Sequence, residues 1–407
     1  MTGRAREAVA LSVGLSFVFW LLREQSYSGD WQNWVRFVED GLWYRLREPV
    51  CLVIYQIGYA ALAPLGVSAK DTLALVNCAA GSASLVIALA TLRRLSPDGR
   101  STWLAFVGFG LSYGVVGVFF GHLEHYAIMS LGVFAYIHCA IRYLDGDGSL
   151  AAAGLVLGLL LATHLMAAWL VPSLLVLPWL RVNRGGWAEL LPAIGTLAAP
   201  NVVAWVVILA FYYAGSVPAI FEDLATGAWS KRHYGVGNAL GGGDVKRFLE
   251  IGEIFAVPHF RSTAALLLLY SPLALVALPV LCIASSEARA QIAGTAVGRF
   301  FLSLAIPYTL FVLTWDAGLG PVRDWDLFSH LTIFLLFLTL IGAMAAPRRI
   351  AAIAVGLGLV ASLAVTSVVV AESADPNGRT GVELLLGALG EETEPQRTRR
   401  SGRRPRG

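Results

Sequence analysis

The sequence predicts an all-α polytopic membrane protein, and three observations support that fold class. Of its 407 residues, 57% are apolar and 14% are charged, whereas a soluble domain carries about a quarter charged residues. The mean hydropathy is +0.67, and apolar runs long enough to cross a bilayer recur along the chain. The net charge of +3 is too small to predict binding to nucleic acid, so the basic residues are better interpreted as topology markers.

The hydropathy pattern predicts about 11 transmembrane helices. One pair is ambiguous, because 150–163 and 165–180 form either one long helix or two short helices that meet at His164. A single helix of that length would measure about 45 Å, which is more than the bilayer core and therefore favours two helices. The predicted spans are 8–22, 72–92, 103–120, 126–141, 150–163, 165–180, 188–213, 263–285, 293–313, 327–346 and 349–371.

The segment 50–66 decides how the chain is threaded. It is short and contains Gln56 and Pro64, so it either crosses the membrane or lies on the outer face as a juxtamembrane or re-entrant helix. If it does not cross, nearly all arginines in the short loops fall on the cytoplasmic side, as the positive-inside rule requires. If it crosses, every later loop changes sides and the rule fails. We therefore predict an outer juxtamembrane or re-entrant helix.

This threading predicts two regions. Residues 1–371 form a transmembrane domain with large outer loops at 23–71 and 214–262, and residues 372–407 form a polar tail. The tail ends in a stretch with six arginines, and its composition predicts disorder. The threading places the tail outside, whereas its arginines favour the cytoplasm, so either side remains open.

Charged residues at the ends of apolar runs are the candidate functional residues, because charge at a membrane boundary must be solvated, paired or used. Asp30 follows the first span, and it is either a catalytic acid or the N-cap of a surface helix over 31–46. The turn after 103–120 contains His122, Glu124 and His125. These could act as acid, base or metal ligand, or they could be ordinary interfacial polarity. Their spacing does not match the H-E-x-x-H pattern of zinc hydrolases.

Two further outer segments contain residues suited to an anionic ligand. Before the span 327–346, Arg323 could bind a phosphate, while Asp324 and Asp326 could orient it, bind sugar hydroxyls or hold a divalent ion. A simple ion pair between Arg323 and an aspartate is the alternative. In the loop 214–262, a glycine-rich stretch resembles a flexible lid and lacks the phosphate-loop pattern. The candidate anion ligands of this loop are Lys231, Arg232, His259 and Arg261.

These features together resemble the GT-C superfamily of integral-membrane glycosyltransferases, including bacterial protein-mannosyltransferase-like and aminoarabinose-transferase-like members. Asp30 lies in the first outer loop, where these enzymes place a catalytic acid, and Glu124 matches an acid of their second outer loop. The segment 72–92 is followed by Arg93, Arg94 and Leu95, similar to the ending found at that place in the bacterial members. The chain departs from the pattern where Ser28-Gly29-Asp30 replaces a common Asp-Glu pair.

The resemblance implies a function at the outer face of the plasma membrane. A sugar would move from a polyprenyl-phosphate-linked donor to a glycan, lipid or protein acceptor, with Asp30 and Glu124 as catalytic residues. The binding residues would be His122, His125, Lys231, Arg232, His259, Arg261, Arg323, Asp324 and Asp326. A divalent cation, Mg²⁺ or Mn²⁺, is compatible with the site but not required. The alternatives are a transporter or flippase of a lipid-linked sugar, or a catalytically inactive GT-C-like subunit.

Overall fold

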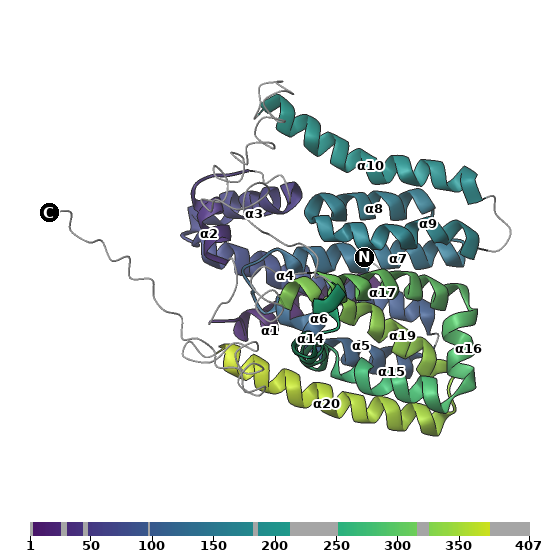
Figure 1. Cartoon of the computed structure of the whole chain (residues 1–407). Helices are drawn as coiled ribbons and strands as arrows, with labels where there is room; N and C mark the ends of the chain where they lie inside the picture. Colours follow the sequence, from purple (N-terminus) through teal and green to yellow (C-terminus); the bar gives the residue numbers. More distant parts are fainter. Residues whose placement is uncertain are drawn as a thin grey trace.

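The computed structural model is a bundle of long helices that run nearly parallel or antiparallel to one another (Figure 1). The structure describes residues 3–25, 31–43, 48–96, 98–181, 186–211, 251–315 and 325–374, and these are almost entirely helical. The main bundle helices are α1 (Gly3–Leu21), α4 (Ala69–Leu95), α5 (Gly99–Gly110), α7 (Tyr126–Asp145), α8 (Leu150–Thr163), α9 (Val171–Leu180), α10 (Gly186–Phe211), α15 (Pro272–Ala284), α17 (Ala296–Thr314), α19 (Leu331–Ala345) and α20 (Arg348–Ala374).

Shorter helices join these or cap the ends of the bundle. They are α2 (Trp31–Glu39), α3 (Pro49–Leu62), η1 (Ala63–Leu65), α6 (Tyr113–Val116), η2 (Gly117–Phe119), η3 (Leu165–Leu170), α13 (Ile251–Ile254), α14 (Val257–Tyr270), α16 (Ser286–Gly294) and α18 (Trp325–Phe328). Five helices of the described chain are long and apolar enough to cross a membrane, or up to seven if each bent pair is one span. The all-α membrane fold is therefore confirmed, whereas the count of eleven is not.

The prediction of two short helices meeting at His164 is confirmed. The helix α8 ends at Thr163, and His164 has an extended backbone with φ −159° and ψ 137°. The chain then continues through η3 into α9, which runs back beside α8. A polar residue is thereby brought to the same end of the bundle as the other candidate residues.

Two predicted spans are broken rather than straight. The run 103–120 bends by 68° between α5 and α6, and the run 263–285 bends by 98° between α14 and α15. Pro272 is the first residue of α15, where its missing N–H costs nothing, while it disfavours helical backbone at Ser271. Both bends were missed because hydropathy does not distinguish one long apolar helix from two that meet at an angle.

Small residues allow α10 to pack closely on α8. A Cβ on Gly154 or Gly158 would overlap the backbone carbonyls of Ala193 or Leu197, and this four-residue spacing of small residues is typical of membrane helix pairs. The Asn201 side chain donates a hydrogen bond of 3.1 Å to the carbonyl of Gly158 across the same interface.

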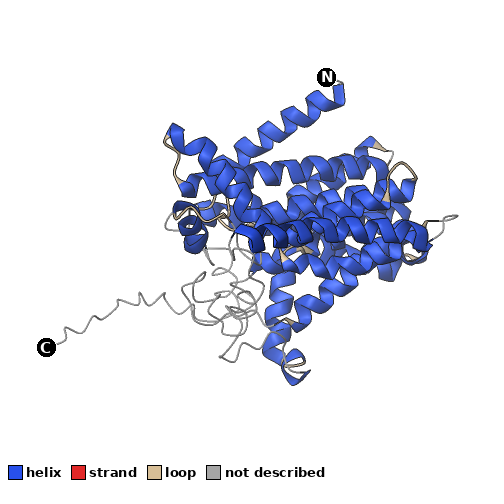
Figure 2. Cartoon of the chain, turned by 90° about the horizontal axis from the view of Figure 1, so that it is seen from above, coloured by secondary structure: helices blue, strands red, loops and turns tan. Residues whose placement is uncertain are grey.

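Ion pairs show which helix ends lie together. At one end of the bundle Glu7 of α1 pairs with Arg93 of α4 at 2.5 Å, and Arg94 pairs with Asp145 of α7 at 3.2 Å. Figure 2 shows α1 projecting from the bundle at the end marked N, and Phe19 is its buried residue.

We call the other end of the bundle the site end. Here α1 ends and α4 begins, so the chain between them, including α3, makes no net crossing of the bundle. This agrees with the predicted threading. The amphipathic helix predicted over 31–46 is shorter in the structure, where α2 ends at Glu39 and residues 44–47 lie outside the described chain.

Candidate functional site

The loop that follows η2 carries the centre of the site and is fixed by buried side chains. Gly121 takes a positive φ of 70°, which glycine adopts without strain, and this turns the chain toward α4. The Asn77 amide of α4 donates hydrogen bonds to the backbone carbonyls of His122 and Glu124, the latter at 2.9 Å. The Tyr55 hydroxyl of α3 lies 3.1 Å from the carbonyl oxygen of Glu124 and 2.9 Å from Asn77 Oδ1, and its single proton is shared between these two acceptors.

His122 joins three segments that are distant in the sequence. Its Nδ1 lies 3.0 Å from Glu24 Oε2, just after α1, and its Nε2 lies 2.8 Å from Asp326 Oδ2 in α18. His122, Glu24 and Asp326 are 1%, 6% and 4% exposed. A backbone hydrogen bond of 2.8 Å from Glu24 N to the carbonyl of Phe120 closes the arrangement.

This environment makes His122 a buried cation. Burial lowers the pKa of His122, but the charge of Glu24 and the hydrogen bonds with Asp326 and Glu24 outweigh burial and raise the pKa well above its usual range. Because each carboxylate can only accept, both ring nitrogens act as donors and both carry protons. One imidazolium therefore stabilises two carboxylates in a place with little water.

Glu124 adds a third carboxylate to this group. It is 7% exposed. One potential metal-ligand atom from each of His122, Glu124 and Asp326 lies within 4.8 Å of the other two. Carboxylates and a protonated imidazole at such distances can accept a proton, hold sugar hydroxyls or bind a cation.

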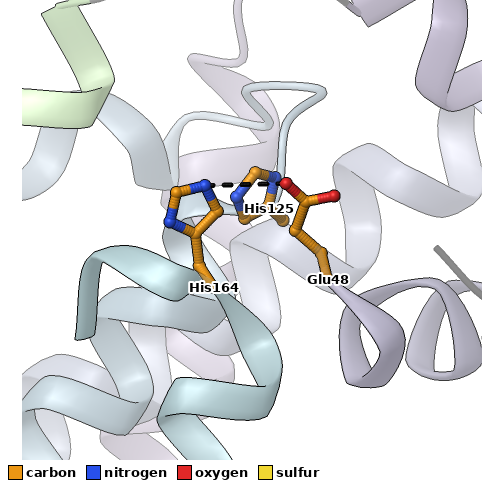
Figure 3. Close-up of side chains that lie close together, drawn as sticks. All are labelled: Glu48, His125 and His164. Atoms are coloured by element: carbon orange, nitrogen blue, oxygen red, sulfur yellow. Dashed lines mark ion pairs between the residues drawn. The ribbon is translucent and has the colours of Figure 1, made fainter. Parts of the chain in front are cut away.

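A second group lies next to the first and contains Glu48, His125 and His164 (Figure 3). The His164 Nε2 is 3.6 Å from Glu48 Oε1, and the His125 and His164 ring centroids are 4.8 Å apart. The His164 Nδ1 accepts a hydrogen bond of 3.1 Å from the Met166 backbone N–H. In its neutral form His164 therefore carries its proton on Nε2, facing Glu48.

Aromatic rings surround the second group and connect it to α7 and α19. The rings of Trp34 and Tyr126 lie 4.8 Å and 4.5 Å from the ring of His125. Tyr126 also lies 6.3 Å from His330, which shares a hydrogen bond of 3.1 Å with Ser130. We call the two groups together the acid–histidine site; its members are Glu24, Glu48, His122, Glu124, His125, His164 and Asp326.

Both groups contain donor sets that could hold a divalent metal ion. Each includes histidine nitrogen, which suits Mn²⁺ or Zn²⁺ better than Mg²⁺, whose preferred ligands are oxygens. A distance of 2.8 Å between His122 Nε2 and Asp326 Oδ2 leaves room for a proton but not for a metal between them. A metal would therefore have to displace the Nε2 proton and separate these two atoms.

The structure brings several of the predicted residues together. His122, Glu124 and Asp326 form one group, while His125 turns to the second. His259 lies in the first turn of α14, and its Nε2 is 2.9 Å from the carbonyl of Leu313 at the end of α17. The exposed Arg261 lies two residues further along α14. The predicted residues that lie outside the described chain are Asp30, Lys231, Arg232, Arg323 and Asp324.

Sequence reasoning missed other members of the site. Glu24 and Glu48 also lie at helix ends, so the signal that identified Glu124 could have identified them. Asn77 lies inside an apolar helix, and its role depends on contacts with a loop 45 and 47 residues away. Arg23 is a further described cation near the site. Its guanidinium lies 4.1 Å above the Trp20 ring, and its Cβ is close to Gly121.

Two solved structures resemble the chain over most of its length. The crystal structure of ArnT from Cupriavidus metallidurans bound to undecaprenyl phosphate matches 86% of this chain and 61% of ArnT, with a TM-score of 0.57 and 13% identity. The archaeal oligosaccharyltransferase AglB from Archaeoglobus fulgidus, in complex with an inhibitory peptide and a dolichol-phosphate, matches 92% of this chain and 56% of AglB, with a TM-score of 0.52 and 9% identity.

The chain has a GT-C-type fold. This confirms the resemblance found in the sequence, although the chain spans only about three fifths of the length of ArnT and just over half that of AglB. No protein-family model and no curated protein sequence matches the chain. At 9% and 13% identity the GT-C likeness concerns the fold, so the chemistry must be argued from the acid–histidine site itself.

Proposed function

We propose that the chain is a membrane glycosyltransferase that moves a sugar from a polyprenyl-phosphate-linked donor to a hydroxyl-bearing acceptor at the outer membrane face. The observation that carries the proposal is the acid–histidine site, in which buried carboxylates and histidines gather at one end of a GT-C-type fold. The bound molecules named for ArnT and AglB, undecaprenyl phosphate and a dolichol-phosphate, support the choice of donor class.

The reaction is a single displacement at the anomeric carbon. The acceptor oxygen forms a bond to that carbon while the bond from carbon to phosphate oxygen breaks, and the electron pair leaves with the polyprenyl phosphate. The acceptor proton passes to a carboxylate. Asp30, predicted from the sequence, and Glu124 are the two candidates for this base. His122 holds Asp326 in place beside Glu124, so that the acid–histidine site is ordered before substrate binds.

Cations would stabilise the phosphate that leaves. The sequence predicts this role for Arg323 and for Lys231, Arg232 or Arg261, and the position of Arg23 beside Gly121 adds a fifth candidate. A phosphate leaves as a stable anion, so positive charge matters more here than a strong acid. A divalent cation held by His122, Glu124 and Asp326 would serve the same purpose, and Mn²⁺ is expected to be more effective than Mg²⁺ because of the histidine ligand.

The central experiment follows the lipid product rather than the unknown sugar acceptor. Purified protein in nanodiscs is given a panel of lipid-linked sugars with a mixed acceptor extract, and free polyprenyl phosphate is quantified by mass spectrometry. Glu124→Gln should reduce its release at least 100-fold, on the scale of a lost acid or base, and Asp30→Asn should do so if Asp30 is the base. The matched control is Glu287→Gln, in an exposed carboxylate of α16.

The same purified protein, reconstituted into liposomes, distinguishes the alternatives. A flippase would move a fluorescent lipid-linked sugar across the liposome membrane without releasing polyprenyl phosphate, and an inactive subunit would do neither. Either result with a well-folded protein overturns the glycosyltransferase proposal.

The outward orientation is tested by labelling single cysteines in cells, in a background without the four native ones. Leu65 and Ile283 are 76% and 82% exposed at opposite ends of the bundle. A membrane-impermeant reagent should label Leu65→Cys and spare Ile283→Cys until the cells are opened. The reverse pattern would place the acid–histidine site in the cytoplasm.

A further inference from the structure

An apolar groove lies between α5, α15, α19 and α20, away from the acid–histidine site. Its volume is about 390 Å³, within the range of sites for small molecules. Among its lining residues Ser101 and Thr339 carry hydroxyl groups, and the others are apolar or glycine. Along α20 it runs from Ala351, near the start of the helix, to Leu359, a distance of about 12 Å.

The groove lies toward the end of the bundle opposite the site end. Its lining includes Leu104 near the start of α5 and Met344 near the end of α19. Both of these helix termini lie at the end where Arg94 pairs with Asp145. A chain-like apolar ligand in this groove would therefore present its polar group at this opposite end.

Two arginines, Arg348 and Arg349, stand just before the first groove residues of α20, a position that we call the mouth of the groove, and they have no protein counter-ion in the described chain. Arg348 and Arg349 are exposed and form no ion pair with a described residue, whereas Arg93 and Arg94 at the same end are paired with acids. Arg348 precedes the groove residue Ala352 by four residues, and residues spaced in this way lie on the same helix face. Positive charge without a protein partner at the mouth of an apolar groove favours an anionic amphiphile.

We propose that this groove binds an anionic phospholipid, with one acyl chain between α5 and α20 and the phosphate against Arg348 and Arg349. Basic pockets between membrane helices on the cytoplasmic side are suited to anionic lipid headgroups. The sugar donor is a poor candidate occupant, since its phosphate must reach the acid–histidine site at the other end. The proposal does not depend on the proposed transferase activity.

Gly356 allows the groove to be filled without disturbing the helices. A Cβ added there would meet no atom within 4 Å, and Gly356 lines the groove. Gly356→Phe therefore places a ring in the space assigned to the acyl chain. Gly195 of α10 is equally open but lies outside the groove, so Gly195→Phe is the matched control.

The test is native mass spectrometry of the full chain, released from nanodiscs of equal phosphatidylglycerol and phosphatidylcholine. The wild type should retain phosphatidylglycerol in excess, by about fivefold for each arginine. Arg348→Gln with Arg349→Gln should bring the ratio close to one. The control is Arg289→Gln with Arg299→Gln, which removes the same charge at the same end from arginines that bind backbone carbonyls.

The groove-filling pair separates this site from a general surface attraction. Gly356→Phe should lose the retained lipid, while Gly195→Phe should keep it, with both variants unfolding at the wild-type temperature. Equal retention of the two lipids by the wild type would overturn the proposal, even if a variant fails to fold. It would also be overturned if polyprenyl phosphate displaced phosphatidylglycerol in competition, or if a second copy of the chain covered the groove and Gly356→Phe abolished a dimer.

Discussion

Replacing His122 with alanine tests the central contact of the acid–histidine site. In the wild type one imidazolium lies between two carboxylates, 3.0 Å from Glu24 and 2.8 Å from Asp326. Alanine removes the cation and leaves both acids in place, 6% and 4% exposed. The folded protein must then bury the two carboxylates without a cation between them.

The expected loss of stability follows from this burial. Removing one partner of a buried ion pair costs about 3–5 kcal/mol, because the remaining charge is uncompensated, whereas losing a neutral hydrogen bond costs about 1 kcal/mol. We expect at least about 3 kcal/mol. At about 2.1 cal/mol/K per residue over 407 residues, this lowers the unfolding temperature by about 3.5 °C or more.

A thiol-reactive fluorophore provides the assay, because Cys51 and Cys78 are buried and react only on unfolding. His138→Ala is the matched control, since the His138 ring is half-buried and bonds the Thr91 hydroxyl at 3.0 Å. The reasoning is refuted if His122→Ala unfolds within about 1 kcal/mol of the wild type. A positive result gains weight if adding Glu24→Gln and Asp326→Asn restores stability, because no charge is then left unpaired.

Three further predictions concern the loop, the helix packing and the pH dependence. Asn77→Leu should lower the free energy of unfolding by about 2 kcal/mol and abolish transfer. Its control is Asn201→Leu, which also loses an amide hydrogen bond between helices and should lose similar stability but keep activity. Melting temperature and product release are measured for both variants. Gly158→Ala should cost about 1–3 kcal/mol through overpacking against α10, measured by the same melting assay. The pKa of His122 is raised in the folded protein, so protonated His122 stabilises the folded state. This contribution to the free energy of unfolding is full below about pH 6.5, the ordinary pKa of histidine, and is lost as the pH rises through the pKa of His122 in the folded state. Wild-type melting temperature should therefore fall on the alkaline side, and His122→Gln should lack that component.

Much of the fold could be predicted because hydropathy reports directly which segments avoid water. Each predicted span corresponds to a helix or a bent helix pair. The positive-inside rule predicted that 50–66 does not cross the membrane. In the structure α1 ends and α4 begins at the same end of the bundle, which agrees with that prediction. The bend at Ser271 was missed, although Pro272 marked the break, because an apolar run has no polar interruption that would separate its two halves.

The candidate site was predicted only where its residues stood out locally. His122, Glu124, His125 and Asp326 are conspicuous since each is a polar group beside an apolar span. Their partners are fixed by tertiary contacts that no local pattern contains. The bond between His122 and Asp326 crosses 204 residues, and sequence spacing suggested instead that Asp326 serves its neighbour Arg323, which lies outside the described chain.

The two halves of the acid–histidine site are coupled through a single backbone loop. Glu124 belongs to the first group and His125 to the second, so a movement of the backbone between them shifts both side chains. Asn77 and Tyr55 fix the carbonyl between them, and His122 ties the same loop to the ends of α1 and α18. The same contacts therefore hold the loop and both groups of candidate residues in place. A substitution at Asn77 should disturb both groups together, while a change at His164 should disturb only the second, and comparison of their product release measures that coupling.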